Sequence, residues 1–391
     1  MKFLRHFVSS FLIFPWLIIA QQSALAFSDL PAAPDKLTDQ IPLENDLSCP
    51  ANLQFEPASH INWKGRIMII WSGLGEFAWA KRLENACKKL GWECIISIDP
   101  VELSEYDRLV QDKPSTSAEI QTLIKQYQPD CVISLKWDCV YSKEVPHYLS
   151  ATGNFEWLTN PVLPSRDLLA FKGILNVTSI EYLKSYFEHN GKKFNSMEWY
   201  PSSTATEYRV VKPQTIFYCG FQWDSMRNGA EYRKMFSLLD QGGYLDIYGP
   251  VHKWDCAPNS VRGMTFDEEE FQLAMQKSGI VLVLHTQGNL DQGAPAARVF
   301  EAAAAGCVII SDKHPFIVRE FGDCILYIDH TQPGEILFEQ INTYRKWILD
   351  HPQEAELMAS KAHAIFSAKF TLEKQLKAFK DFHLMILEES N

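Results

Sequence analysis

The chain has 391 residues, of which 46% are hydrophobic and 22% are charged, and its formal net charge at pH 7 is −11. This length allows two ordinary domains with cores of their own, and the composition excludes a disordered or fibrous chain. A negative charge without a clustered basic face argues against a nucleic-acid partner.

The first predicted element is a secretory signal over residues 1–26. Lys2 and Arg5 precede an apolar stretch from Phe7 to Ala20, and Ala24-Leu25-Ala26 has the small-x-small form of a cleavage site. We therefore expect export to a periplasm, a lumen or the exterior. An uncleaved signal, which would associate the chain with a membrane, is the alternative.

The nine cysteines form no C-x-x-C motif, and several lie in apolar strand-like runs. In such runs cysteine behaves as a small hydrophobic residue, so we expect mostly reduced, buried thiols. The sequence also lacks an Asp-x-Asp motif. We therefore expect no metal site.

Residues 27–62 are polar and rich in proline, and they are predicted to form a linker or arm. Strands and helices then alternate through a predicted N-terminal lobe, residues 63–205, although 141–172 reads as irregular. The strands are expected at 66–73, 92–99, 131–137 and 174–178, and the helices at 76–91, 118–128 and 178–191.

A second run of the same kind predicts a C-terminal lobe, residues 206–370. Its strands are expected at 214–220, 243–250, 280–285, 307–312 and 324–329, and its helices at 230–239, from 265 and at 295–306. Thr265 and Glu268 have the spacing of a capping box. From about residue 334 the chain reads as helical, and a helix over 371–391 is expected to cross back to the N-terminal lobe through an apolar stripe of Phe370, Leu372, Leu376 and Phe379.

Alternating strands and helices of these lengths predict parallel sheets with right-handed crossovers. The expected fold class is therefore α/β, with two doubly wound Rossmann-like lobes that face a central cleft.

Residues 281–312 carry the strongest functional pattern. An apolar strand ends at His285, on the edge of the sheet where open α/β folds bind ligands. A loop containing Gly293 follows, and the next helix begins near Pro295, so its free amides and dipole favour an anion. Arg298 adds a permanent charge to this site, and Glu301 shares its helix face. An ordinary exposed Arg–Glu pair on a surface helix is the alternative interpretation.

The pattern R-x-F-E-A-x-A-x-G, followed by an apolar strand and Ser-Asp, resembles the donor-binding helix of family 4-type GT-B glycosyltransferases. It is most similar to the "glycosyl transferases group 1" domains and the CgeB-like branch, in which a preceding strand ends in L-x-L-H. The resemblance implies a nucleotide-diphospho-sugar donor in the C-terminal lobe and an acceptor in the N-terminal lobe. The acceptor, whether carbohydrate, lipid or protein, is not implied.

Two features depart from the family. The first glutamate of the E-x7-E pair would fall at Gly293, although Asp291 lies nearby. The basic pair that many relatives carry is represented by Arg227 at most, with Arg233 as an alternative. The predicted site is therefore Glu301 and His285 as catalytic residues, with Arg298, Arg227, Gly293 and Ala296 binding the donor.

Weaker candidates come from several other segments. Two glycines could let a turn approach a ligand, two histidines could face the cleft, and four aromatic residues could stack on sugars. They are Gly73 and Gly75; His147 and His314; and Trp137, Trp157, Trp199 and Tyr200.

These patterns predict a metal-independent, hexosyltransferase-like glycosyltransferase that transfers a sugar to an acceptor hydroxyl and needs no cofactor beyond its donor substrate. An exported two-lobed ligand-binding protein would explain the signal better but not the R-x-F-E helix. A degenerate transferase that serves as a binding module is the third interpretation, suggested by Gly293.

Overall fold

A computed structural model describes residues 62–71, 74–98, 116–135, 140–150, 168–176, 181–220, 224–263 and 267–389. The chain divides into Met1–Ile41 and Pro42–Asn391, and all described residues lie in the second unit. The predicted signal therefore lies outside the described residues, as do Gly73, Trp137 and Trp157. None of the described helices is long and apolar enough to cross a membrane.

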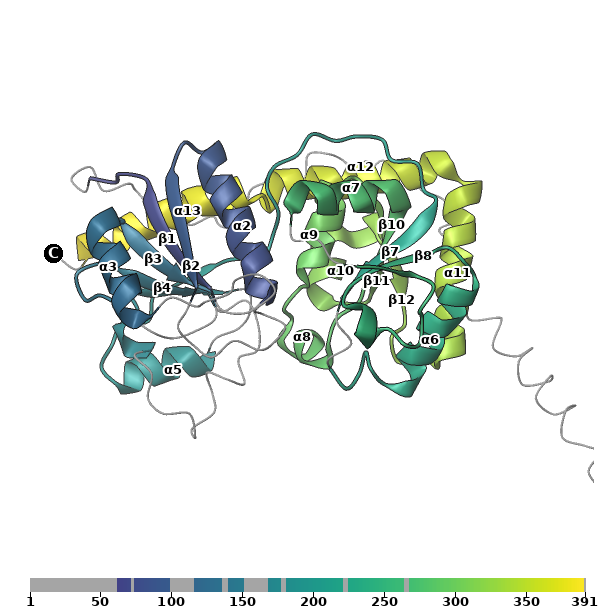
Figure 1. Cartoon of the computed structure of the whole chain (residues 1–391), viewed down its shortest axis with the longest axis horizontal. Coiled ribbons are helices and arrows are strands. Elements are labelled where there is room, and N and C mark those ends of the chain that lie inside the picture. Colours follow the sequence, from purple (N-terminus) through teal and green to yellow (C-terminus); the bar gives the residue numbers. More distant parts are fainter. Residues whose placement is uncertain are drawn as a thin grey trace, which may run out of the picture. The chain divides into compact units, whose positions relative to one another are not determined.

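The N-terminal lobe is built on a sheet of six parallel strands in the order β2-β1-β3-β4-β5-β6. Figure 1 labels the first four of these strands. Alternate residues of β1 pack to opposite faces, Ile67 and Ile69 on one side and Met68 and Ile70 on the other. This burial on both faces is typical of a parallel sheet covered by helices. The strands are β1 (Arg66–Trp71), β2 (Glu93–Ile98), β3 (Cys131–Ser134), β4 (His147–Ser150), β5 (Gly173–Asn176) and β6 (Ser196–Glu198), and the helices are α2 (Leu74–Lys89), α3 (Ser117–Tyr127) and α5 (Glu181–His189).

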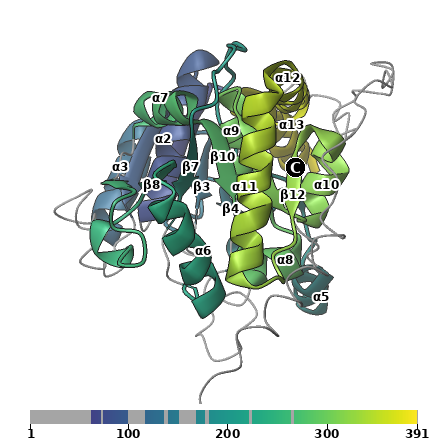
Figure 2. The ribbon, with the colours of Figure 1, turned by 90° about the vertical axis from the view of Figure 1, so that its right-hand side faces the viewer.

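The C-terminal lobe repeats this plan, with six parallel strands in the order β12-β11-β10-β7-β8-β9. Helices α7, α9, α10 and α12 share one apolar core with the sheet, whereas α6 and α11 pack side by side on the opposite face (Figure 2). The strands are β7 (Thr215–Cys219), β8 (Leu245–Tyr248), β9 (Val261–Gly263), β10 (Gly279–Val283), β11 (Val308–Asp312) and β12 (Leu326–Ile328). The helices are α6 (Ala230–Gln241), α7 (Glu268–Ser278), α8 (Gln287–Gln292), α9 (Ala297–Ala304), α10 (Pro315–Phe321), α11 (Gly334–Asp350) and α12 (Pro352–Lys369).

The last helix, α13 (Leu372–Glu389), belongs to the N-terminal lobe although α12 belongs to the C-terminal one (Figure 1). Leu372, Leu376 and Phe379 are buried in the N-terminal core, and Phe370, just before the crossing, is buried in the C-terminal core. The chain thus passes between the lobes twice, at residues 199–214 and again at residues 370–371. The predicted fold class of two doubly wound α/β lobes is confirmed.

Among the described elements, three short strands and two helices, α8 and α10, were not predicted. Strands β4, β6 and β9 have three or four residues each, too few for a period to be recognised. Helix α8 occupies most of the segment that was expected to be a loop before the donor helix, and Thr286 caps it by accepting a hydrogen bond from the Asn289 amide.

The prediction of a capping box between Thr265 and Glu268 was wrong. Asp267 caps α7 instead, because its side chain accepts a hydrogen bond from the Glu270 amide at 2.9 Å. The carboxylate of Glu268 is thereby left for other partners, which are Asn85 of the N-terminal lobe and Ser203 of the segment 199–214 between the lobes.

Candidate functional site

The ends of three neighbouring strands of the C-terminal lobe bring polar side chains together. Cys219 ends β7, Asp312 ends β11, and His285 follows β10 by two residues. Because these strands are parallel, their carboxyl ends meet at one edge of the sheet, where open α/β folds bind ligands. Helices α8 and α9 both follow β10 and lie next to this edge.

His285 connects the sheet to the start of α9. Its ring Nδ1 donates to the Asp312 carboxylate at 2.6 Å, and its backbone amide donates to the same carboxylate at 2.7 Å. Its Nε2 then accepts a hydrogen bond from the Ala296 amide at 3.0 Å. Both ring nitrogens of His285 are therefore engaged within the protein, and its side chain is fully buried. In this arrangement His285 positions α9 and offers no free nitrogen to a substrate.

Asp312 is the fixed charge of this chain of hydrogen bonds. Burial alone would raise its pKa, but His285, which bonds to it twice, holds the pKa of this carboxyl below its usual range. The His285 ring also stacks on His314, with ring centroids 4.3 Å apart. His314 in turn caps α10 and contacts the Asn289 carbonyl of α8 at 3.2 Å. The cluster thus ties β10, β11, α8 and the start of α9 into one unit.

The start of α9 has the features of an anion site. Gly293 has a φ of 68°, a left-handed conformation that suits glycine, and it ends α8 just before Pro295. Ala296 is the N-cap residue, so the next amides, those of Ala297 and Arg298, point out of the helix start. Among the described residues no acceptor is assigned to these two amides. The amides of Gly293 and Ala296 themselves are already hydrogen-bonded.

Arg298 and Glu301 form the predicted pair on α9, but the pair is not an exposed one. Glu301 is 2% exposed, and it bonds through one carboxylate oxygen to Arg298 and through the other to Arg82 of α2. Arg298 keeps 28% of its side chain exposed and lies over the Phe271 ring, 4.6 Å from its centroid. The interpretation as an ordinary surface pair therefore does not describe Glu301.

Two guanidinium groups control the protonation of Glu301. Burial would raise the pKa of this carboxyl, but the guanidinium groups of Arg298 and Arg82 together hold its pKa below the usual range. The charges of Arg298, Glu301 and Arg82 also act on the thiol of Cys219, which burial keeps in its neutral form by raising its pKa. We call Arg82, Arg298 and Glu301 the charged triad, and it lies at the carboxyl end of β7.

Arg227 and Arg233, the two candidates for the missing basic pair, differ in their surroundings. Arg227 is largely buried and pairs with Asp224 at 2.5 Å in the segment between β7 and α6. Arg233 lies on α6 and pairs at 2.7 Å with Asp255, whose side chain is 70% exposed. Arg227 lies in the segment that follows β7, at the carboxyl edge of the sheet. It is therefore better placed than Arg233 to reach a ligand at this edge.

The weaker candidates are placed in structural roles. His147 lies on β4, 1% exposed, and its ring accepts a hydrogen bond from the Tyr141 amide at 3.2 Å and contacts the Val145 carbonyl at 2.7 Å. Trp199 and Tyr200 are buried in the cores of the N-terminal and C-terminal lobes. Gly75 lies in the first turn of α2.

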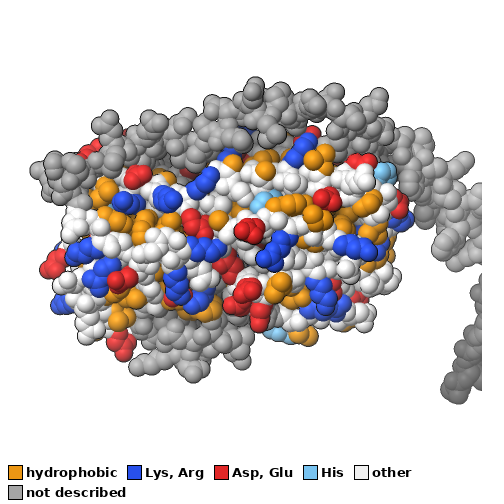
Figure 3. Space-filling view, turned by 90° about the horizontal axis from the view of Figure 1, so that it is seen from above, with side chains coloured by type: hydrophobic (Ala, Val, Ile, Leu, Met, Phe, Trp, Pro, Cys, Tyr) orange, Lys and Arg blue, Asp and Glu red, His pale blue; other side chains and the backbone are white. Residues whose placement is uncertain are grey.

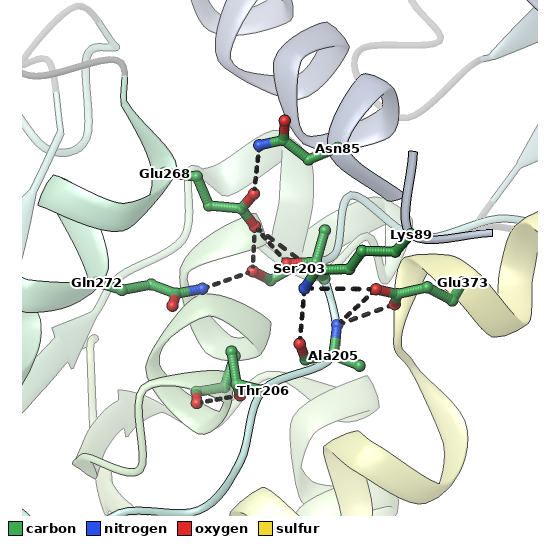
Figure 4. Close-up of polar contacts among 10 residues, drawn as sticks. Asn85, Lys89, Ser203, Ala205, Thr206, Glu268, Gln272 and Glu373 are labelled. Atoms are coloured by element: carbon green, nitrogen blue, oxygen red, sulfur yellow. Dashed lines mark hydrogen bonds and ion pairs between the residues drawn. The ribbon is translucent and has the colours of Figure 1, made fainter. Parts of the chain in front are cut away.

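Further polar contacts between the lobes are made by residues of α2 that follow Arg82 (Figure 4). Asn85 donates to the Glu268 carboxylate at 3.0 Å, and the same carboxylate accepts from the Ser203 hydroxyl at 2.9 Å. One turn further on, Lys89 donates to the Ala205 carbonyl at 2.8 Å. Sequence reasoning missed Arg82, Asn85 and Glu268, although the spacing of three residues between Arg82 and Asn85 on one helix face was a readable signal.

Two observations concern other ligand classes. Among the described residues no group of three or more His, Cys, Asp or Glu side chains is placed to hold a metal ion. On the face shown in Figure 3, the described basic and acidic side chains are interspersed, so this face presents no continuous basic strip for a phosphate backbone.

Three buried histidines make the stability of the protein depend on pH. Burial lowers the pKa of His147, His314 and His383 to about 4. An unfolded histidine has a pKa of about 6.5, so between pH 6.5 and 4 the unfolded chain binds more protons than the folded one. We expect the free energy of unfolding to fall as the pH is lowered through this window, by up to about 1.4 kcal/mol per pH unit for each histidine. Urea unfolding at pH 7, 6 and 5 measures this slope, and equal stabilities at the three values would contradict it.

Comparison with known proteins adds the family context. Residues 228–381, which include α9, match the family model described as "Glycosyl transferase-like". No curated protein shows a significant match in sequence. The predicted resemblance to GT-B glycosyltransferases is confirmed at this level, whereas the family 4-type and CgeB-like assignments stay predictions.

Three solved structures are similar to this chain, the first of them closely enough to show the fold. A glycosyltransferase from Rickettsia africae is 14% identical, with a TM-score of 0.50 over 83% of this chain and 98% of that one. A sucrose-phosphate synthase from Thermosynechococcus elongatus is 11% identical, with a TM-score of 0.48 over 80% and 98%. A protein assigned as a UDP-N-acetylglucosamine 2-epimerase from Listeria monocytogenes is 15% identical, with a TM-score of 0.46 over 83% and 97%. At such identities the likeness to the first concerns the fold alone, which is of the GT-B type.

Proposed function

We propose that this protein is a glycosyltransferase that binds a nucleotide-diphospho-sugar at the start of α9 and transfers the sugar, a hexose, to an acceptor hydroxyl. The observation that carries the proposal is the position of Arg298. It is a partly exposed guanidinium beside two helix-start amides at the carboxyl edge of the sheet, within the stretch that matches a glycosyltransferase-like family. One nitrogen of Arg298 donates to Glu301, and we propose that its remaining N–H groups bind the ligand.

The chemistry of transfer explains why such a site is needed. The bond between the anomeric carbon and a diphosphate oxygen breaks, a bond from the acceptor oxygen forms, and the hydroxyl proton is released to solvent. Negative charge therefore grows on the departing nucleoside diphosphate. The amides of Ala297 and Arg298, the dipole of α9 and the Arg298 guanidinium are already oriented to stabilise that charge, without reorganisation during the reaction.

Each residue of the predicted site has a role in this proposal. Arg298 contacts the diphosphate, and Arg227 approaches it from the segment after β7. Gly293 and Ala296 shape the turn into α9, and His285 positions that turn through Asp312. Glu301 aligns Arg298 in the described state, and we propose that its carboxylate also accepts hydrogen bonds from donor hydroxyls once the donor is bound.

A screen of nucleotides tests the proposal. Residues 62–391 would be heated with UDP, GDP, the free nucleosides and free sugars, each with and without EDTA, and the unfolding temperature recorded. We expect a nucleoside diphosphate to raise this temperature with or without EDTA, because the proposed site is independent of metal. Stabilisation by a free sugar alone would instead support an exported binding protein, which the glycosyltransferase-like family match does not favour. A donor that binds but is never transferred would support a degenerate transferase.

A further inference from the structure

Arg82 is the member of the charged triad that has no role in the proposed donor binding. It lies in the middle of α2 in the N-terminal lobe, and it is 7% exposed. One of its nitrogens bonds to Glu301 of the C-terminal lobe, and its guanidinium carbon lies 5.5 Å from the Trp79 ring centroid. Its Nε is buried and has no hydrogen-bond partner among the residues that the structure describes.

The charge balance around Arg82 is incomplete. The charged triad contains two guanidinium groups and one carboxylate, so it carries a net charge of +1. The neighbouring Cys219 adds no negative charge, because burial raises the pKa of its thiol. A buried cationic group with an unsatisfied N–H is costly, and a functional role or a bound ion is among the explanations for such a group in a native structure.

The position of Arg82 indicates what the missing partner is. Its guanidinium and that of Arg298 bind opposite oxygens of one carboxylate, so both lie next to Glu301 at the end of β7. An anion that reaches Arg298 at the start of α9 therefore enters the field of both guanidinium groups. A diphosphate has the charge and the number of acceptor oxygens to satisfy them, and planar guanidinium groups suit phosphate geometry.

We propose that Arg82 is a second cationic residue of the donor site, supplied by the N-terminal lobe, which binds the donor diphosphate together with Arg298. The inference rests on the proposed function and deepens it. It makes the donor site a composite of both lobes, so the diphosphate is held fully only while α2 and α9 are in contact.

A neighbouring residue provides a matched control. Asn85 lies three residues after Arg82 on the same helix and also bonds to the C-terminal lobe, at Glu268 (Figure 4). Asn85 is a neutral amide, and neither Asn85 nor Glu268 belongs to the charged triad. Asn85→Ala therefore removes a contact between the lobes without changing the charge at the donor site.

Calorimetric titration with UDP, GDP and the corresponding free nucleosides tests the inference. Arg82→Gln keeps a hydrogen-bond donor for Glu301, and Arg82→Met keeps the volume of the side chain, so at least one of the two is expected to fold. In each folded variant we expect the affinity for the preferred nucleoside diphosphate to fall about tenfold, the typical effect of losing one charge-assisted contact. The affinity should also depend less on salt, because one cation is missing. Nucleoside binding, and all binding by Asn85→Ala, should stay as in the wild type.

Two outcomes separate this inference from the function on which it rests. If Arg298→Ala weakens binding while the folded Arg82 variants bind as tightly as the wild type or more tightly, Arg82 only joins the lobes and the inference is overturned alone. If the wild-type protein binds no nucleoside diphosphate, the proposed function and the role of Arg82 are both overturned.

Discussion

Ending the chain after Thr371 should abolish cooperative unfolding of the N-terminal lobe. This truncation removes α13, which supplies five buried side chains to the N-terminal core: Leu372, Leu376, Phe379, Phe382 and Ile386. Truncating one large core side chain typically costs about 2–5 kcal/mol, and a whole domain is stable by only about 5–15 kcal/mol. The loss of all five therefore exceeds what the lobe can sustain. Scanning calorimetry of the truncated and full chains measures the effect, and equal melting temperatures would contradict it.

A point substitution gives the same test on an intact chain. Phe379 is fully buried, and its ring meets the Tyr148 ring edge to face at a centroid distance of 5.0 Å. We expect Phe379→Ala to lower the free energy of unfolding by about 3–5 kcal/mol. Lys377, two residues earlier on the same helix, is exposed, and Lys377→Ala should change the stability by less than about 0.5 kcal/mol.

The second large effect is expected for Glu301→Gln. The substitution keeps the shape of the side chain but leaves two guanidinium groups at a buried position without their counter-charge. Breaking a buried ion pair by removing one partner costs about 3–5 kcal/mol, so the melting temperature should fall markedly. An exposed pair on an ordinary helix would be worth only about 0.2–0.5 kcal/mol.

The same variant should separate binding from transfer. Without the carboxylate, the site becomes more positive, so affinity for a nucleoside diphosphate should be retained or increased. Transfer should fall, because the proposed partner of the donor hydroxyls has lost its charge.

Glu335→Gln is the control for both effects, since it removes a carboxylate from a surface pair whose side chains are 50% and 60% exposed. A Glu301→Gln protein with wild-type stability would show that the triad contributes little to the fold.

The sequence predicted most of the framework because its signals are local. Apolar runs such as residues 66–71 and 279–283 have the length of buried strands. The glycines that end several helices are a second signal that can be recognised in the sequence. The α9 helix was also readable, since Ala302 to Ala305 are all buried against the core as a small-residue run suggests. Strand β4 was missed because four residues carry no recognisable period.

The candidate site was only partly predictable, because its key contacts join residues far apart in the sequence. Arg298 and Glu301 share one helix, and their spacing alone suggested that they interact. Arg82 bonds to Glu301 across 219 positions, and no local pattern connects the two. The same holds for His285, whose hydrogen bonds to Asp312 and Ala296 depend on how β10, β11 and α9 meet.

Calorimetric titration of the wild-type protein and Arg298→Ala with UDP, GDP and their free nucleosides tests the central claim most directly. If Arg298 binds the diphosphate, the variant should lose about ten- to a hundredfold in affinity for the preferred nucleoside diphosphate, the typical effect of removing a charge-assisted hydrogen bond worth about 1.5–3 kcal/mol. The affinity for the nucleoside should hardly change, because the nucleoside lacks the group that Arg298 contacts. Equal diphosphate affinities in the wild type and in a folded Arg298→Ala variant would contradict the proposed donor site at α9.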